Sequence, residues 1–331
     1  MTKNINRRTS NFFIIIFSLS LCFGASAALA SEKLSATQQG IIYYNQLKAE
    51  AAIPYLQKGA DAGDNEAQYY LAETLRKKNR HMTADAQHWY ESAAAQGNIY
   101  AMIQLGRRSS DLCQQMKNCP EAQKTPAEWL IQANKSALLN AQKGDAESMY
   151  LMYEITSDRS WLEKSANAGY SMAQYWMAVG DRQGEGFFIL PGKRQESVRK
   201  WLKSASEGGY PTAMMDYLQI LFEDGDMEGI RHWLQIAADT GEQRAVSNYG
   251  AYIAHTPDKI GYPLDLEKGY ALFTLLKELD GGGAIQDYVQ EKHEEIAGKM
   301  TAEQIVNAKK TAAAWKASHP PLSFFPDKLS R

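Results

Sequence analysis

The 331-residue sequence lacks the short motifs that mark most enzymes. Its six histidines and three cysteines include no CxxC pair and no HExxH or HxxxH spacing, which would place two metal ligands on one helical face. A GxSxG nucleophile elbow and a Walker phosphate-binding loop are also missing. The triple glycine at 281–283 is followed by Ala-Ile, not by the Lys-Ser/Thr that holds a phosphate. We therefore predict a protein that is not an enzyme, with no catalytic residue, no metal site and no cofactor.

Long apolar runs are absent after the first thirty residues, so no later segment is apolar enough to cross a bilayer. Within those thirty, basic residues precede a largely apolar stretch at 12–23. Residues 28–30 (ALA) then fit the small-x-small pattern of a signal peptidase site. We predict a cleaved signal peptide over residues 1–30 and a mature protein exported to the periplasm.

Two alternatives to cleavage stay open. The first is an uncleaved membrane anchor, because the apolar stretch is only a little shorter than a bilayer span. Cys22 suggests lipidation, although Leu21 stands where lipoprotein signals have a small residue.

A basic excess is missing as well. The chain has 36 lysines and arginines against 38 acidic residues. Removal of residues 1–30 takes away Lys3, Arg7 and Arg8 and leaves a net charge of −5. Nucleic acid is not an expected partner, because binding it requires a basic surface that neutralises phosphates. The full chain is 44% apolar and 11% aromatic, which is enough for an ordered core.

Cysteine is scarce, so only one disulfide is expected in the mature protein. After cleavage only Cys113 and Cys119 remain, with five residues between them. In an oxidising compartment this spacing favours a disulfide that closes a short loop, and two free thiols are the alternative.

What the sequence does contain is one thirteen-residue phrase written five times, with an aromatic residue first, glycine ninth and alanine thirteenth. The copies are YLQKGADAGDNEA (55–67), WYESAAAQGNIYA (89–101), WLEKSANAGYSMA (161–173), WLKSASEGGYPTA (201–213) and WLQIAADTGEQRA (233–245). In the third copy Trp161, Ser165 and Ala168 stand at three- and four-residue steps. We expect such residues to share the buried helical face, with the aromatic residue as its large anchor.

The rest of the phrase predicts a corner between two helices. Glycine at the ninth place suits a helix C-terminus, where a left-handed backbone has no Cβ penalty. Alanine then opens a closely packed helix, and a large apolar residue follows one turn later. A sixth corner at Gly144 lacks the aromatic residue, and the six glycines are spaced by 34, 47, 25, 40 and 32 residues. This period is typical of stacked helix pairs, and the longest interval predicts a disulfide-closed insert near 108–125.

Together these features resemble the Sel-one-like repeat family, a branch of the tetratricopeptide superfamily. The stretches that carry the resemblance are LGRR (105–108), NYGAY (248–252), QGEGFFILPGKRQESVRKWLKSASEGGYPTA (183–213) and YPLDLEKGYALFTLLKELDGGGA (262–284). The resemblance implies an all-α fold over residues 31–318. It further implies a right-handed superhelical α-solenoid of about six to seven helix pairs.

The C-terminal stretch TAEQIVNAKKTAAAWKASHPP (301–321) predicts a capping helix. Thr301 with Gln304 forms a capping box, and two prolines end the helix. Its apolar stripe consists of Ala302, Ile305, Ala308, Ala312 and Trp315. For the tail, residues 319–331, we expect folding back onto the last repeat, with docking to a partner as the alternative.

The resemblance also implies that the first helix of each pair lines a concave side. The inward positions lie one residue before, two after and six after the small residue that opens each helix. The predicted protein-binding groove comprises Glu66, Tyr69, Glu73, Tyr100, Arg107, Tyr150, Glu154, Tyr175, Met215, Gln219, Arg244 and Ser247. Tyrosines among charges are typical of protein-binding surfaces. The alternative is that these tyrosines pack between helices. For Tyr69 and Tyr150 the sequence favours a groove position and a packing position equally.

The sequence thus predicts an exported repeat domain that binds another protein, with no membrane span after signal cleavage. The family includes scaffolds of protein complexes, host-interaction factors and periplasmic immunity proteins that neutralise antibacterial type VI secretion effectors. Export as a single repeat domain favours an immunity protein whose partner is a toxin effector. A periplasmic scaffold or regulator of an envelope complex and a secreted host-interaction factor are the alternatives.

Overall fold

The computed structural model describes residues 34–279 and 284–329. The chain divides between Leu34 and Ser35 into two units, and every helix described below belongs to the second unit, Ser35–Arg331. The predicted signal peptide at residues 1–30, with its two alternatives, lies outside the described residues.

The described residues of the second unit form α-helices, one short 3-10 helix (η1) and an isolated β-bridge. The elements are α1 (Ala36–Asn45), α2 (Ala49–Asp61), α3 (Asn65–Asn79), α4 (Ala84–Ala95), α5 (Ile99–Gly106), η1 (Arg107–Ser110), α6 (Leu112–Met116), α7 (Pro126–Ala141), α8 (Ala146–Thr156), α9 (Arg159–Asn167), α10 (Ser171–Arg182), α11 (Lys193–Glu207), α12 (Pro211–Glu223), α13 (Met227–Asp239), α14 (Gln243–Ile253), α15 (Leu266–Lys277), α16 (Ala284–Ala297) and α17 (Ala302–Ser318).

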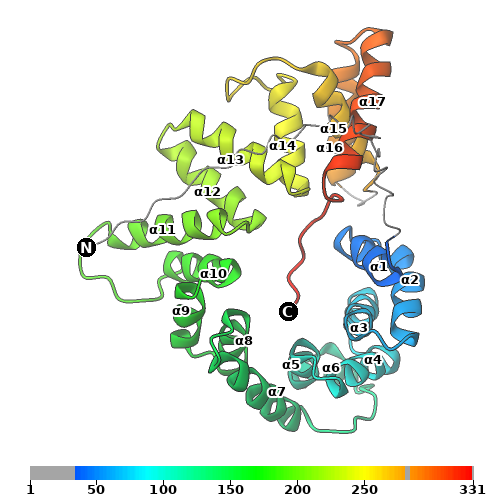
Figure 1. Cartoon of the computed structure of the whole chain (residues 1–331), viewed down its shortest axis with the longest axis vertical. Helices are drawn as coiled ribbons and strands as arrows, with labels where there is room; N and C mark the ends of the chain where they lie inside the picture. Colours follow the sequence, from blue (N-terminus) through cyan, green and yellow to red (C-terminus); the bar gives the residue numbers. More distant parts are fainter. Residues whose placement is uncertain (1–33, 280–283, 330–331) are drawn as a thin grey trace, which may run out of the picture. The chain divides into compact units, whose positions relative to one another are not determined.

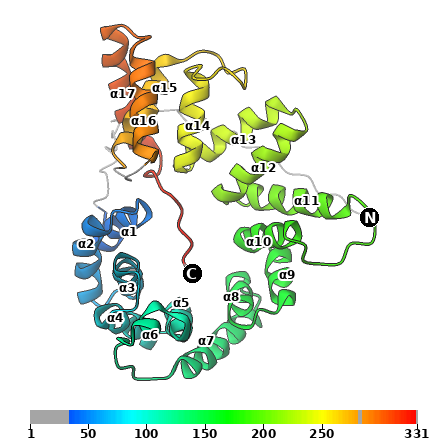
Figure 2. The same cartoon turned by 180° about the vertical axis from the view of Figure 1, so that it is seen from behind.

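The helices form a stack of pairs. Seven consecutive pairs, from α1/α2 to α14/α15, precede α16 and α17, and the short α6 stands between α5 and its partner α7. Apart from α6, each helix from α1 to α15 packs against the next one along the chain, and α15 also carries α16 and α17. Figures 1 and 2 show this order from two sides. The predicted all-α solenoid is confirmed.

Glycine ends the second helix of a pair at each predicted corner. The backbone φ angle of these glycines is positive, between 81° and 93°, at Gly63, Gly97, Gly144, Gly169, Gly209 and Gly241. At the first corner, the Asp64 side chain accepts a hydrogen bond from the backbone N–H of Ala67 at 3.1 Å and so caps α3. The predicted left-handed corner is therefore confirmed.

The small residues that open the next helices are buried completely. Their side chains are 0% exposed at Ala67, Ala101, Ala173, Ala213 and Ala245. The large apolar residue four positions later is at most 7% exposed in each case. A methyl group at the crossing point lets two helices approach closely, and the larger side chain fills the space beside it.

The predicted role of the first aromatic residue is wrong. Trp161 is only partly buried and Ala168 is exposed, whereas Leu162 is 1% exposed. The buried face runs through the second, fifth and sixth places of the phrase, here Leu162, Ser165 and Ala166. The tryptophan lies at the edge of that face, and Lys164 covers its ring at 4.2 Å from the centroid. Three- and four-residue spacing fits both faces, so the sequence pattern did not separate them.

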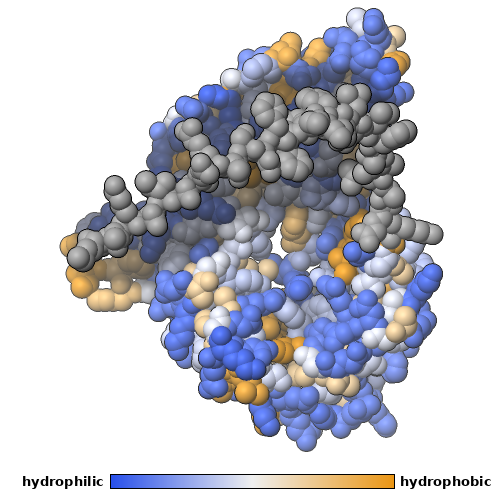
Figure 3. All heavy atoms as spheres, in the orientation of Figure 1, coloured by the Kyte–Doolittle hydropathy of each residue, from blue (hydrophilic) through white to orange (hydrophobic). Residues whose placement is uncertain are grey.

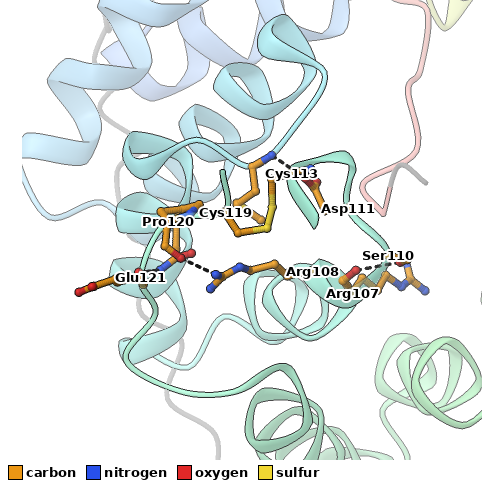
Figure 4. Close-up of a disulfide and its surroundings, with 10 residues drawn as sticks. Arg107, Arg108, Ser110, Asp111, Cys113, Cys119, Pro120 and Glu121 are labelled. Atoms are coloured by element: carbon orange, nitrogen blue, oxygen red, sulfur yellow. Dashed lines mark hydrogen bonds between the residues drawn. A yellow bond between two sulfur atoms is a disulfide. The ribbon is translucent and has the colours of Figure 1, made fainter. Parts of the chain in front are cut away.

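The predicted disulfide is confirmed. Cys113 in α6 is bonded to Cys119, with a Cα–Cα separation of 4.7 Å, and its side chain is buried (Figure 4). Beside the bridge, the Arg108 guanidinium donates to the carbonyl oxygen of Pro120. The bridge therefore closes a compact loop between α5 and α7.

Hydrogen bonds fasten this insert to the preceding pair of helices. The Asp111 carboxylate accepts from the backbone N–H of Met82, in the corner between α3 and α4, at 2.9 Å. On the far side of the bridge, Gln87 of α4 donates to the carbonyl oxygen of Glu121. The insert therefore covers one side of α4.

The C-terminal helix α17 has the predicted capping box, in which Thr301 and Gln304 each accept from the other's backbone N–H. Ala308, Ala312 and Trp315 are buried, and α17 packs on α15. At the start of the predicted stripe, Ala302 is exposed, so the apolar contact begins later than the pattern indicated.

Candidate functional site

The tail returns from α17 to the last repeat pair. The backbone N–H of Ser323 donates to the carbonyl oxygen of Gly241 at 2.9 Å, and its carbonyl accepts from the N–H of Gln243 at 3.0 Å. These two bonds form a parallel bridge at the start of α14. The predicted folding back onto the last repeat is confirmed.

The same segment also reaches the first repeat, which the sequence did not predict. The backbone N–H of Phe324 donates to the carbonyl oxygen of Asn45 at 2.9 Å. Gln46 donates from its side-chain amide to the carbonyl of Leu322 at 3.1 Å, across 276 residues of sequence. We call Leu322–Phe324 the proximal tail, and it joins the end of α1 to the start of α14.

The distal tail, Pro326–Leu329, continues from there into the space that the helices surround, where the red segment of Figures 1 and 2 ends. The Tyr69 hydroxyl on α3 donates to the carbonyl oxygen of Lys328. The Lys328 ammonium lies 4.9 Å from the centre of the Tyr100 ring and 4.0 Å from the carboxylate of Glu147. A basic side chain is thus received by an aromatic face and an acidic group.

Side chains also hold the residues on either side of Lys328. Leu329 is 9% exposed and joins the apolar cluster of the N-terminal repeats. The carboxylate of Asp327 lies 3.4 Å from the Tyr210 hydroxyl, which donates to it. Among residues 34–279 and 284–329, no hydrogen bond joins the distal tail's backbone to the helix backbones.

An aromatic surface underlies the tail. Its rings contact one another in pairs: Tyr69–Tyr100 at 5.9 Å, Tyr150–Tyr170 at 5.7 Å, Tyr175–Tyr210 at 5.2 Å and Tyr175–Trp176 at 5.7 Å between centroids. We call these seven residues, together with Glu147 and Glu154, the aromatic groove. Figure 3 shows that this view of the molecule is hollowed near its centre, while its outer parts are mainly hydrophilic.

The tyrosine hydroxyls of the groove act as hydrogen-bond donors. Tyr100 donates to the carboxylate of Glu147, and Tyr150 donates to that of Glu154 at 2.7 Å. Burial, with the neighbouring Tyr170 and Glu147 adding to it, raises the pKa of Tyr100 well above its usual range. Burial and the charge of Glu147 raise the pKa of Tyr170 to about 12. The hydroxyls therefore stay protonated at physiological pH.

Two cavities flank the tail. One of about 430 Å³ lies among Tyr175, Tyr210, Arg244 and Phe325, and another of about 390 Å³ lies among Tyr100, Tyr150, Glu154 and the distal tail. Trp176 lines both.

The indole of Trp176 is an unsatisfied donor. Its buried Nε1–H has no acceptor within the described part of the chain. In general, a buried donor that lacks an acceptor costs about 1–3 kcal/mol.

Half of the predicted groove residues meet at the tail or in these cavities. They are Tyr69, Tyr100, Tyr150, Glu154, Tyr175 and Arg244. Arg107 lies next to them and pairs with Glu154 at 2.5 Å. Tyr69 and Tyr150 are 2% and 4% exposed, so they pack between helices and still turn their hydroxyls toward the groove.

The other predicted residues lie elsewhere. Glu73 is fully buried and accepts from the Tyr90 hydroxyl at 2.6 Å, and Ser247 is buried as well. Glu66 is exposed on α3. Met215 and Gln219 line a separate cavity of about 680 Å³. The assumed inward positions therefore fit the middle repeats better than the ends of the stack, and a role in binding stays a prediction.

The sequence rule missed Tyr170, Trp176 and Tyr210. Tyr170 and Tyr210 occupy the N-cap positions of α10 and α12, where their side chains make no capping hydrogen bond. The corresponding residue at other corners is a capping Asp, Asn or Glu. An aromatic residue where the repeat calls for a cap was the signal that could have found them.

The groove has the chemistry of a binding surface. In residues 34–279 and 284–329, no group of three or more His, Cys, Asp or Glu side chains could hold a metal ion. Nor is any helix of that part long and apolar enough to cross a membrane. The aromatic groove is lined by aromatic faces and carboxylates, and its tyrosine hydroxyls donate to these carboxylates and to the tail.

Two solved structures of repeat proteins are among those to which this chain is similar. No family model and no curated protein matches the sequence. A protective antigen of uropathogenic Escherichia coli strains, which displays an SLR fold, is 18% identical at a TM-score of 0.47, over 86% of this chain and 61% of that one. A Sel1 repeat protein from Oxalobacter formigenes is 20% identical at a TM-score of 0.38, over 83% and 85%. The chain thus spans less than two thirds of the first structure, and both are Sel1-repeat proteins.

Proposed function

We propose that the chain is an exported protein-binding domain, not an enzyme, and that the aromatic groove is its interaction surface. The observation that carries this proposal is the extended peptide already lying along the groove, with its lysine received by Tyr100 and Glu147. Tyrosine contributes large contact area and a polar tip, which suits it to protein recognition. Because the groove accommodates one peptide segment, its chemistry can accommodate a partner's.

Within this class we propose an immunity protein that binds and neutralises an antibacterial type VI secretion effector in the periplasm. Support comes from the N-terminal sequence expected of an exported protein and from the lack of catalytic motifs in the sequence. A toxin active at low copy number must be held with a dissociation constant near the nanomolar range, about 12 kcal/mol of binding free energy. A stiff repeat stack favours such affinity because docking orders few residues.

The test is deletion of the gene in a strain attacked by siblings with an active type VI system. The deletion strain should die, and the full protein should rescue it. A version without residues 2–30 should not, because it would not meet the toxin. Survival of the deletion strain, with no effector recovered by pull-down on the mature domain, would favour a scaffold or regulator of an envelope complex.

Groove variants connect the phenotype to the surface. Tyr100→Ala and Arg244→Ala should weaken rescue and effector binding, because aromatic and arginine side chains carry most interface energy. Gln219→Ala is the matched control, since Gln219 is exposed beside a different cavity. Equal rescue by all three variants would show that the partner binds elsewhere.

A further inference from the structure

We propose that the ligand of the aromatic groove is an extended partner segment with an aspartate or asparagine, a basic residue and an aliphatic residue in succession. In the free protein, the distal tail occupies this site as an intramolecular competitor. This inference rests on the proposed protein-binding function and names the chemistry of the partner. The sequence Asp327-Lys328-Leu329 is the pattern that the groove already receives.

Three subsites define the pattern. The Tyr210 hydroxyl donates to the side-chain oxygen of the aspartate or asparagine. The Tyr100 ring and Glu147 receive the basic residue, and the apolar cluster of the N-terminal repeats receives the aliphatic one. The order of the subsites along the groove fixes the direction of the bound chain.

The tail is built in two parts that differ in how they are held. The proximal tail makes three backbone-to-backbone hydrogen bonds and one from a side-chain amide. The distal tail is held by side chains alone, through Tyr69, Tyr210 and the Lys328 contacts. Between them, Phe325 has a φ of 45°, a left-handed conformation that is unfavourable for a residue other than glycine. Release of the distal tail relieves this residue while the proximal tail stays in place.

The groove has room and an unused donor for a partner that the tail does not satisfy. The cavities of about 430 and 390 Å³ border the distal tail on both sides, and Pro326 and Asp327 line both of them. The buried Trp176 Nε1–H has no acceptor in the described residues. A partner segment with larger side chains and an oxygen near Trp176 therefore gains contacts that the distal tail lacks.

Competition between the distal tail and a partner segment determines how much removal of the tail should strengthen partner binding. A segment tethered by a few residues acts at an effective concentration in the millimolar range. A ligand in trans with similar contacts must overcome this concentration. Removing the distal tail should tighten its binding by roughly tenfold or more.

The experiment measures fluorescence anisotropy with a labelled synthetic peptide of the sequence FFPDKL. It compares the full mature chain with a chain that ends after Phe325 and keeps the proximal tail. A second variant, full-length Lys328→Glu with Leu329→Asp, releases the distal tail without shortening the chain. Both variants should bind the peptide at least about tenfold more tightly than the unchanged chain. Equal binding by all three proteins, or none by either variant when circular dichroism shows native helix content, would overturn the proposal.

Matched controls test the subsites. A peptide of the same composition in scrambled order should bind weakly. Glu147→Gln in the shortened chain should weaken binding of FFPDKL several-fold, because it removes the charge that faces the lysine. Glu66→Gln, an exposed carboxylate on α3, should leave binding unchanged. Equal effects of the two substitutions would contradict the proposed basic subsite.

The outcomes separate this inference from the proposed function. If a protein partner binds the groove but removal of the distal tail leaves its affinity unchanged, the competitor role is wrong and protein binding stands. If the peptide binds as expected and deletion of the gene has no phenotype, the immunity role is wrong and the groove chemistry stands. A dimer that forms only with the distal tail present, seen by light scattering, would make a second copy the occupant and overturn the proposal.

Discussion

At two corners of the stack, the N-cap residue is a tyrosine that lines the aromatic groove and does not cap its helix. Where Asp64 caps α3, Tyr170 and Tyr210 stand at the equivalent positions and make no capping bond. Loss of a cap typically costs about 1 kcal/mol. The rings are instead used in the groove, where Tyr170 contacts Tyr150 and Tyr210 contacts Tyr175.

The second place of the repeated phrase, not the first, should carry the stability of a repeat. Leu162→Ala removes a side chain that is 1% exposed and should cost about 2–5 kcal/mol. Trp161→Ala should cost less, because its ring lies at the edge of the core under Lys164. The measurement is the shift in denaturation midpoint by circular dichroism. A larger loss of stability for Trp161→Ala than for Leu162→Ala would show that the aromatic residue is the main core residue of the repeat.

Docking of the distal tail should depend on the ionisation of Asp327. Desolvation raises the pKa of this carboxyl, as does the charge of Glu154, while the Tyr210 hydroxyl and Lys77 lower it. A raised pKa means that the docked state binds the proton more tightly than the released state. Docking should therefore strengthen as pH falls through the raised pKa and weaken as pH rises above it.

Asp327→Asn isolates this effect, because asparagine cannot ionise. At pH 7 the full-length variant should bind the FFPDKL peptide more weakly than the unchanged chain, since its own tail docks more tightly. The difference should shrink toward pH 4. Because other carboxylates titrate in both proteins, only the difference between them is informative, and a difference independent of pH would exclude Asp327 as its source.

At the scale of elements, the helix pairs and their corners were predictable because they depend on local chemistry. Gly169 with its φ of 92° and Ala173 with no exposed surface follow from residue type and spacing. Which face of each helix is buried could not be predicted, since Trp161 and Leu162 are both apolar and adjacent. The groove was predicted only in part, because Tyr210 and the tail come together through contacts between distant repeats.

The disulfide should stabilise its insert modestly. Cys113 and Cys119 are six positions apart, and closing so short a loop constrains the unfolded chain by about 2–3 kcal/mol at most. Cys113→Ser with Cys119→Ser should lower stability by no more than that. In the purified folded protein, alkylation without reductant should leave both cysteines unmodified by intact mass. Modification of both in the folded protein would refute the bridge in solution.

At the scale of the whole second unit, the tail links repeats that lie at opposite ends of the sequence. The proximal tail bonds to Asn45 and Gly241, and Lys48 donates directly to the carbonyl of Glu278. Repeat stacks otherwise depend on contacts between neighbours. These long-range bonds tie the first pair to the last and hold the tail over the groove.

Amide hydrogen exchange tests this central claim most directly. The Ser323 and Phe324 amides donate to Gly241 and Asn45, so we expect them to exchange as slowly as amides within the helices. The amides of residues 327–329 should exchange much faster, because side chains hold this part of the tail. Exchange of Ser323 and Phe324 at the rate of a free peptide would show that the proximal tail does not join the first pair of helices to the last.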